Sequence, residues 1–290
     1  MKEIVVLSGK GGTGKTSITA SLAVLAGSDA IIADCDVDAA NMHLLMEPDF
    51  ANSQKFYSGE LAEINYDICT SCGICAEKCR FDAIHLTNNT YTINPLSCEG
   101  CGYCEKVCPT HAITMKERFS GYVYFSKIKG NSSMVHARLD IGAENSGKLV
   151  SKVKNEAKSL AELQNKTFVI VDGSPGIGCP VVSSLSGANY VVLVTEPTVS
   201  GLHDLERVYS VIKRFRIKSG CIINKFDINP KKTEEITEFL KKENITHLAN
   251  IPFDQAFTQA MTQGKTIVES DFALHQLLLT IWNQIKLETN

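Results

Sequence analysis

The sequence predicts an α/β fold with a mainly parallel, twisted sheet covered by helices on both faces, into which a small cysteine-rich domain is inserted. An apolar run at residues 4–7 is followed at once by the glycine-rich loop GKGGTGKT, residues 9–16, and then by helical periodicity. The second half of the chain alternates between short apolar runs and helical patterns, which implies right-handed crossovers between parallel strands. Eight of the eleven cysteines fall into two short runs, at residues 69–79 and 98–108.

Length, composition and charge are typical of a globular protein that can bury a core, with 290 residues, 44% hydrophobic and 21% charged. The net charge is -3 and the sequence has no broad basic face, so we expect no nucleic-acid partner. The first strand begins almost at Met1 and no apolar stretch is long enough to span a bilayer. We therefore expect a cytoplasmic protein with no signal peptide and no membrane partner. Clustered cysteines in such a chain favour metal binding over disulfides.

The glycine-rich loop has the strand, loop and helix context of a P-loop. Its glycines let successive backbone N–H groups and the helix N-terminus point at one anionic group. Lys15 would reach the β- and γ-phosphates, and the Thr16 hydroxyl would ligate Mg²⁺. A glycine turn that merely joins a strand to a helix would need neither residue at a fixed offset. We expect ATP and Mg²⁺ as ligands, bound by Gly11, Gly12, Thr13, Gly14, Lys15, Thr16 and Ser17.

Acidic residues follow two further strands. One short apolar strand leads into DCDVDAAN, residues 34–41, and a later strand ends in Asp172, before GSPGIG. The carboxyl ends of parallel strands are where α/β sheets collect ligands. Asp38 fits a helix cap better than Asp36 does. We therefore expect Asp36 and Asp172 near Mg²⁺, with Asp34 and Asp38 as weaker candidates.

Lys10, directly after the first glycine of the loop, makes the loop resemble the deviant P-loop of the MinD/ParA ATPase group, which includes the nitrogenase iron protein and the Mrp-type iron-sulfur carriers. The resemblance implies that Lys10 crosses a dimer interface to the nucleotide of a second subunit, identical or paralogous. The alternative is a solvated loop lysine. The resemblance also implies that Asp36 positions the attacking water, that Asp172 holds Mg²⁺ through water, and that the Gly176 N–H senses the γ-phosphate.

The same resemblance extends to the C-terminal half, at TEPTVSG, residues 195–201, and at two strand ends. In the family, an asparagine at the position of Asn224 pairs with adenine, and the segment after a strand-ending proline, here Pro252, flanks the base. A turn residue is the alternative for Asn224.

The two cysteine runs are an internal duplication. CTSCGICAEKC and CEGCGYCEKVC share the spacing C-x2-C-x2-C-x3-C at an offset of 29 residues, and they resemble a bacterial two-cluster ferredoxin. Zinc is the main alternative, but a zinc site needs four thiolates and does not require two copies of this fused four-cysteine spacing. Arg80 stands where the first run would be expected to carry proline. Because the fourth cysteine of each run serves the other cluster, we expect two 4Fe-4S clusters, one held by Cys69, Cys72, Cys75 and Cys108 and the other by Cys98, Cys101, Cys104 and Cys79.

Three cysteines lie outside these runs. Cys35 and Cys221 lie in apolar strands, so we expect them in the core. Cys179 lies close to the position at which the nitrogenase iron protein places a cluster ligand, but that protein supplies two cysteines per subunit. A buried or capping thiol is therefore the expected role of Cys179, with a shared metal or redox site as the alternative.

Periodicity assigns the remaining elements and the domain boundaries. Residues 119–141 are expected to form two strands of an antiparallel ribbon, followed by a helix that Ser146 caps. The insert is too small to fold unaided, so it should collapse without its clusters. Strands and helices are expected to alternate at residues 168–171, 190–195, 202–215, 220–224, 233–242 and 247–251. We expect the α/β domain at residues 1–55 and 120–290, and the insert at residues 56–119.

Three functions fit these motifs. The first is an ATPase that couples dimerisation or switch movement to electron transfer through the clusters to an unidentified redox partner. The second is an iron-sulfur carrier like the Mrp group, which usually has a C-x-x-C in the C-terminal half that this chain lacks. The third is a positioning ATPase of MinD or ParA type. MinD uses a basic amphipathic tail, whereas residues 272–287 carry only Lys286 as a base, so we expect that helix to pack on the core.

Overall fold

The computed structural model describes residues 1–143 and 147–289. The chain divides into two compact units, which we call unit 1 and unit 2. Unit 1 consists of Met1–Gln54, Tyr122–Leu139 and Asn145–Asn290, and unit 2 of Lys55–Gly121 and Asp140–Glu144.

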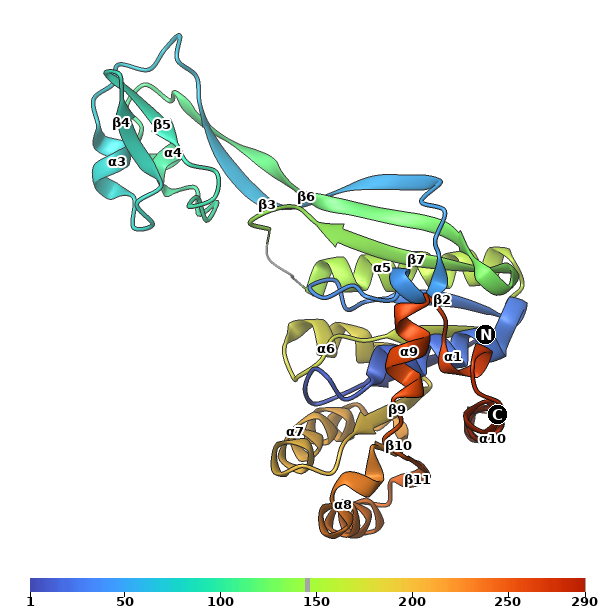
Figure 1. Ribbon diagram of the computed structural model, residues 1–290. Helices are drawn as coiled ribbons and strands as arrows, with labels where there is room; N and C mark the ends of the chain where they lie inside the picture. The colour runs from blue at the N-terminus through green and yellow to red at the C-terminus, as the bar shows by residue number, and fades with distance from the viewer. Residues whose placement is uncertain (144–146, 290) are drawn as a thin grey trace. The chain divides into compact units, whose positions relative to one another are not determined.

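The described residues form one large sheet of nine strands in the order β11-β10-β9-β1-β8-β2-β7-β6-β3 (Figure 1). Every pairing from β11 to β7 is parallel, which confirms the predicted mainly parallel sheet. The parallel strands are short and buried, as expected for strands covered on both faces. The strands are β1 (Lys2–Leu7), β2 (Ala30–Asp34), β3 (Asn52–Ile64), β6 (Ile113–Ile128), β7 (Ser132–Leu139), β8 (Phe168–Asp172), β9 (Tyr190–Thr195), β10 (Lys218–Asn224) and β11 (Thr246–Ile251).

Helices cover both faces of the parallel part of this sheet (Figure 1). On one face, α1 contacts β1, β2, β8 and α10. On the other face, α5 contacts β2, β7 and β8, while α6 contacts β1, α7 contacts β9 and α8 contacts β11. This arrangement is the predicted α/β fold. The helices of unit 1 are α1 (Lys15–Ala26), α2 (His43–Met46), α5 (Gly147–Leu163), α6 (Cys179–Leu185), α7 (Val199–Phe215), α8 (Pro230–Lys242), α9 (Ala256–Thr262) and α10 (Phe272–Thr289).

The C-terminal helix α10 packs on the core, as the sequence predicts. Leu278, Ile281 and Ile285 are fully or almost fully buried, and the Trp282 ring meets the Phe168 ring edge to face at 5.1 Å. Among the helices of the described residues, none combines the length with the apolar composition that crossing a bilayer requires.

The segment after the cysteine runs forms the two predicted strands, β6 and β7, which are neighbours joined by a short turn, but it also belongs to the main sheet, which was not predicted. Its second strand, β7, pairs in parallel with β2, with Ile31 opposite Ser133. Met134, Val135 and Ala137 are buried, so β7 is an interior strand of the main sheet. A short apolar run cannot by itself distinguish such a strand from a ribbon. The predicted cap Ser146 lies outside the described residues.

Unit 2 has an internal two-fold pattern that follows the sequence duplication. Its elements are α3 (Ile74–Lys78), α4 (Tyr103–Val107) and the antiparallel pair β4 (Ile84–Thr87) and β5 (Thr90–Ile93). The Asn65 N–H donates to the Ala112 carbonyl at 2.7 Å, and the Asn94 N–H donates to the Ala83 carbonyl at 2.7 Å. Both donors and both acceptors are related by the 29-residue offset. Each repeat therefore bonds to the other.

The turns that end α3 and α4 have the same geometry. Cys79 has φ -73 and ψ 114, and Cys108 has φ -74 and ψ 115. Arg80, in the place of the expected proline, thus leaves this turn unchanged.

Candidate functional site

The strand ends and the glycine loop bring one ammonium group against two carboxylates. The Lys15 Nζ lies 2.8 Å from Asp172 Oδ1 and 3.2 Å from Asp36 Oδ2. The Thr16 hydroxyl donates to Asp172 Oδ2 at 2.8 Å. Register explains this convergence, because Asp172 is opposite both Val6 of β1 and Asp34 of β2. Lys15, Thr16, Asp36 and Asp172 therefore form one cluster at the carboxyl edge of the sheet.

Burial controls the charges in this cluster. Lys15 is only 5% exposed, and although burial opposes its charge, Asp172 and Asp36 raise its pKa above the ordinary value. Burial, followed by the charge of Asp172, raises the pKa of Asp34 to about 8. Burial also raises the pKa of Asp36, against the effect of Lys15. A further cation would therefore be stabilised beside these carboxylates.

The sequence analysis missed a second hydroxyl in this cluster. Thr19 Oγ1 lies 2.9 Å from Asp172 Oδ1 and donates to the Lys15 carbonyl at 2.8 Å. A signal was present, because Thr19 lies one helical turn after Lys15 on the same side of α1.

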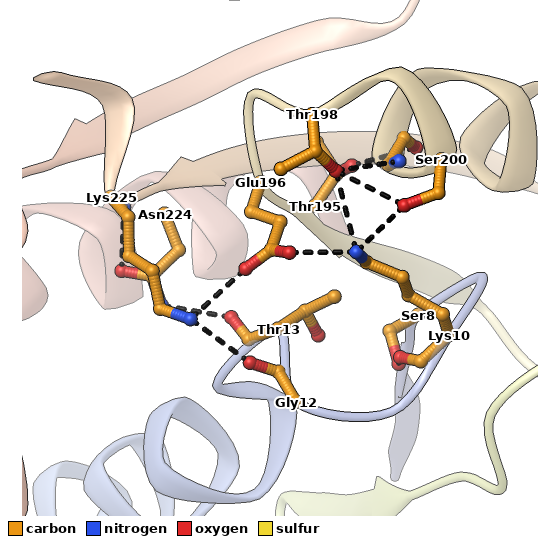
Figure 2. Close-up of polar contacts among 11 residues, drawn as sticks. Ser8, Lys10, Gly12, Thr13, Thr195, Glu196, Thr198, Ser200, Asn224 and Lys225 are labelled. Atoms are coloured by element: carbon orange, nitrogen blue, oxygen red, sulfur yellow. Dashed lines mark hydrogen bonds and ion pairs between the residues drawn. The ribbon is translucent and has the colours of Figure 1, made fainter. Parts of the chain in front are cut away.

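The end of β10 holds the glycine loop by its carbonyl groups (Figure 2). Asn224 Nδ2 donates to the Thr13 carbonyl at 2.8 Å, and Lys225 Nζ donates to the Gly12 carbonyl at 3.1 Å. Gly14, at φ +91, has no room for a side chain, since a Cβ would lie 2.4 Å from Asn224 Nδ2. To pair with adenine, Asn224 would have to give up its bond to Thr13, so that role stays a prediction.

Lys10 lies on the outer part of the loop and contacts the segment after β9 (Figure 2). Its Nζ lies 2.7 Å from Glu196 Oε1, 2.9 Å from Ser200 Oγ and 3.3 Å from Thr198 Oγ1. The Ser8 hydroxyl donates to the Lys10 carbonyl at 2.8 Å. The Lys10 side chain is therefore bonded to residues of its own chain and is not simply a solvated loop lysine. Its contact with a nucleotide on a second subunit stays a prediction.

The structure also places three other predicted site residues, Gly176, Pro252 and Ser17. The Gly176 N–H donates to the Ser8 carbonyl at 3.0 Å, so it would have to break this bond to sense a phosphate. Pro252 directly follows β11, and the next residue, Phe253, is held by an N–H bond to Asp227 Oδ1 at 2.7 Å, with its ring half exposed. Ser17 lies in the first turn of α1, with its carbonyl accepting from the Ser21 hydroxyl. The roles of Gly176, Pro252 and Ser17 stay predictions.

In unit 2, two cavities are each lined by cysteines from both runs. The larger cavity, about 650 Å³, is also lined by Arg80 and Met115. A smaller cavity is also lined by Tyr91 and Thr110. The cysteines carry free thiols. Those at the larger cavity are Cys79, Cys98, Cys101 and Cys104, and those at the smaller one are Cys69, Cys72, Cys75 and Cys108.

Backbone N–H groups support the fourth cysteine of each run. The Ala83 N–H donates to Cys79 Sγ at 3.5 Å, and the Ala112 N–H donates to Cys108 Sγ at 3.2 Å. Thr110 Oγ1 lies 3.7 Å from Cys108 Sγ. In the part of the chain that the structure describes, no three His, Cys, Asp or Glu side chains are grouped as ligands of a single metal ion would be.

The three remaining cysteines lie in unit 1. Cys35 and Cys221 are fully buried, as predicted, and burial raises the pKa of both thiols. Cys179 is the first residue of α6 and is exposed, and Gly178 occupies the N-cap position, so the expectation of a buried or capping thiol is wrong. Pro180 lies in the first turn of this helix, where its missing N–H costs no helical hydrogen bond.

Comparisons with known proteins agree with the fold and the loop. The family described as the CobQ/CobB/MinD/ParA nucleotide binding domain matches residues 4–267. An uncharacterized protein of Methanocaldococcus jannaschii, MJ0578, is 37% identical over 230 residues, 78% of this chain and 79% of that protein. The cell division ATPase MinD of Pyrococcus furiosus has 20% identity and a TM-score of 0.58, with 98% of both chains covered. The septum site-determining protein MinD of Pyrococcus horikoshii, complexed with Mg-ADP, has the same identity and TM-score over 98% of this chain and 95% of that one.

Proposed function

The chain belongs to the CobQ/CobB/MinD/ParA family of nucleotide-binding domains. We propose that it is an ATPase whose dimerisation or switching is coupled to electron transfer through two 4Fe-4S clusters. ATP hydrolysis is the activity of the MinD/ParA group of this family. The Mg-ADP bound to the Pyrococcus horikoshii relative supports ATP and Mg²⁺ as ligands of this chain.

The cluster around Lys15 supports the nucleotide chemistry. Mg²⁺ would be held by Thr16, Asp36 and Asp172 and would neutralise charge on the phosphates. Lys15 would exchange its bonds with Asp172 and Asp36 for bonds to the phosphates, and Asp36, freed from Lys15, would orient the attacking water. The carboxylates then remain beside a cation, so none is left buried and unpaired.

The observation that carries the electron-transfer part is that each of the two cysteine-lined cavities of unit 2 is lined by three cysteines of one run and the fourth of the other. A 4Fe-4S cluster binds its four thiolates at four separate iron atoms, whereas zinc needs all four sulfurs about 2.3 Å from one point. No three described His, Cys, Asp or Glu side chains are grouped in this way, so the proposal rests on the two four-cysteine linings. N–H groups directed at Cys79 and Cys108 fit the charge of cluster ligands. Bound there, the clusters would supply one-electron transfer.

Proximity along the chain supports coupling between the two chemistries. Unit 2 begins at Lys55, close in sequence after Asp36, so a phosphate-dependent movement of the segment that follows β2 could be passed on. A second copy of the chain or a paralogue would complete the dimer, and a redox protein would exchange electrons with unit 2.

The test is anaerobic purification followed by iron and sulfide analysis, ATPase assays, and redox titration with ATP and with ADP. We expect about eight iron atoms per chain, as two 4Fe-4S clusters require. We also expect ATP hydrolysis and a cluster potential or partner affinity that differs between the nucleotide states. A folded protein without iron would refute the clusters, and identical redox behaviour with ATP and ADP would refute the coupling.

A positioning ATPase is the second candidate, favoured by the likeness to MinD structures. The buried face of α10 is the observation against a membrane-binding tail. ATP-dependent sedimentation with liposomes would support this candidate over the first.

A further inference from the structure

One carboxylate, that of Glu196, bridges two lysines at the rim of the glycine loop (Figure 2). Glu196 directly follows β9, and its side chain is 14% exposed. Its Oε1 lies 2.7 Å from Lys10 Nζ, and its Oε2 lies 2.9 Å from Lys225 Nζ. The two lysines come from different elements, Lys10 from the glycine loop and Lys225 from the end of β10.

The contacts of Lys10 fill the bonding capacity of its ammonium group. An ammonium has three N–H donors. Glu196, Ser200 and Thr198 provide three acceptors, at 2.7, 2.9 and 3.3 Å. All three lie in the segment that ends β9 and begins α7 of the same chain. For Lys10 to reach a phosphate on another subunit, these bonds must be exchanged.

We propose that Glu196 is a positioning residue that holds Lys10 within its own chain and competes with the phosphates of a nucleotide bound to a second subunit. The proposal rests on the proposed ATP-driven dimerisation. It implies that the strength of the contact between Glu196 and Lys10 sets the protein concentration at which dimers form with ATP.

The second lysine explains how this contact can open without leaving a buried charge alone. Lys225 bonds to both Glu196 and the Gly12 carbonyl, so it stays in place when Lys10 leaves. Glu196 then keeps one cationic partner. Lys10 has no such anchor on the loop side, because its other two contacts are hydroxyls that can bond to water instead. Lys10 is therefore the partner that moves.

The variant Glu196→Gln tests the proposal, because the amide keeps the shape of the side chain and removes its charge. We expect the dissociation constant of the dimer, measured by analytical ultracentrifugation with Mg²⁺ and a non-hydrolysable ATP analogue, to fall about tenfold, since the two ion pairs per dimer that hold Lys10 in its own chain are lost. The matched control is Glu235→Gln, which makes the same chemical change at a partly exposed ion pair with Lys232 on α8, outside the nucleotide site, and should leave the dissociation constant unchanged.

A second measurement follows Lys10 directly. In nucleotide-free protein, the rate at which an amine-directed acylating reagent modifies Lys10, read by mass spectrometry, should rise severalfold in Glu196→Gln and stay unchanged in the control Glu235→Gln. If the wild-type protein dimerises with the analogue but Glu196→Gln dimerises equally or less well, the proposed role of Glu196 is wrong and the proposed dimerisation stands. A wild-type protein that does not dimerise would overturn both the proposed dimerisation and the competition.

Discussion

Replacing Lys15 by methionine should destabilise unit 1 even when no nucleotide is present. Lys15 is almost fully buried, and its ammonium is the cation that neutralises Asp36 and Asp172. Methionine fills a similar volume but leaves these carboxylates without a positive partner. The variant Lys15→Met thus isolates the charge of Lys15 from its packing.

The expected size follows from the surroundings of the two carboxylates. Removing one partner of a buried ion pair typically costs about 3–5 kcal/mol. Asp172 keeps its contacts with the hydroxyls of Thr16 and Thr19, and the Asp36 side chain is 10% exposed. We therefore expect the lower limit, about 3 kcal/mol of unfolding free energy at pH 7.

Urea denaturation followed by tryptophan fluorescence measures this change. The chain has a single tryptophan, Trp282, which is buried in unit 1 against Phe168 and so reports the unfolding of that unit. The control Lys232→Met breaks a partly exposed ion pair with Glu235 on α8 and should leave the midpoint unchanged.

A double-mutant cycle decides whether the charge is the cause. In the background Asp172→Asn, Lys15→Met should cost at least 1 kcal/mol less, roughly the coupling expected for residues in direct contact. If Lys15→Met is equally destabilising with and without Asp172→Asn, the ion pair does not explain the loss, and our account of the cluster is wrong.

Three further predictions concern other sites. Thr110→Val removes a hydrogen bond to Cys108 Sγ that is worth about 0.5–1 kcal/mol. In an EPR-monitored titration it should lower the midpoint potential of one cluster by about 20–40 mV, and unchanged potentials would contradict this. Burial, with a smaller effect of His43, lowers the pKa of His136 to about 4. An unfolded histidine has a pKa near 6.5, so below that pH the unfolded chain binds a proton at this residue and the folded chain does not. The free energy of unfolding therefore falls as the pH drops from 6.5 towards 4, by about 2 kcal/mol between pH 7 and pH 5. His136→Phe should remove that part of the pH slope in urea denaturation, and an unaltered slope would refute the assignment. Removal of iron by a chelator should abolish amide-exchange protection in unit 2 while Trp282 fluorescence stays native, and retained protection would show that unit 2 folds without clusters.

The sequence predicted the features that depend on local pattern. The P-loop context located Lys15 and Thr16, and strand ends located Asp36 and Asp172, because register alone brings parallel strand ends together. The alternation of elements gave the parallel order of the sheet.

Features that depend on distant pairing were not predictable. Glu196 contacts Lys10 and Lys225, which lie 186 and 29 residues away along the chain, and the segment TEPTVSG that contains it predicts neither contact. The Asn224 amide contacts the Thr13 carbonyl, 211 residues away. The position of β7 inside the sheet was missed for a similar reason, since its neighbour β2 is about 100 residues earlier. Cys179 was expected to be a buried or capping thiol because no second cysteine accompanies it, and the sequence does not show that this end of α6 is exposed.

The two bonds from the end of β10 to the glycine loop determine more than the position of the loop. A peptide unit is planar, so holding the carbonyls of Gly12 and Thr13 also fixes the direction of the N–H groups of Thr13 and Gly14. These amides are oriented when the protein folds, before any anion arrives. Binding then requires little ordering of the loop, and the loss of conformational entropy that usually opposes association is correspondingly small. A substitution at Asn224 would therefore weaken phosphate binding by loosening the loop, even if it never touched the nucleotide.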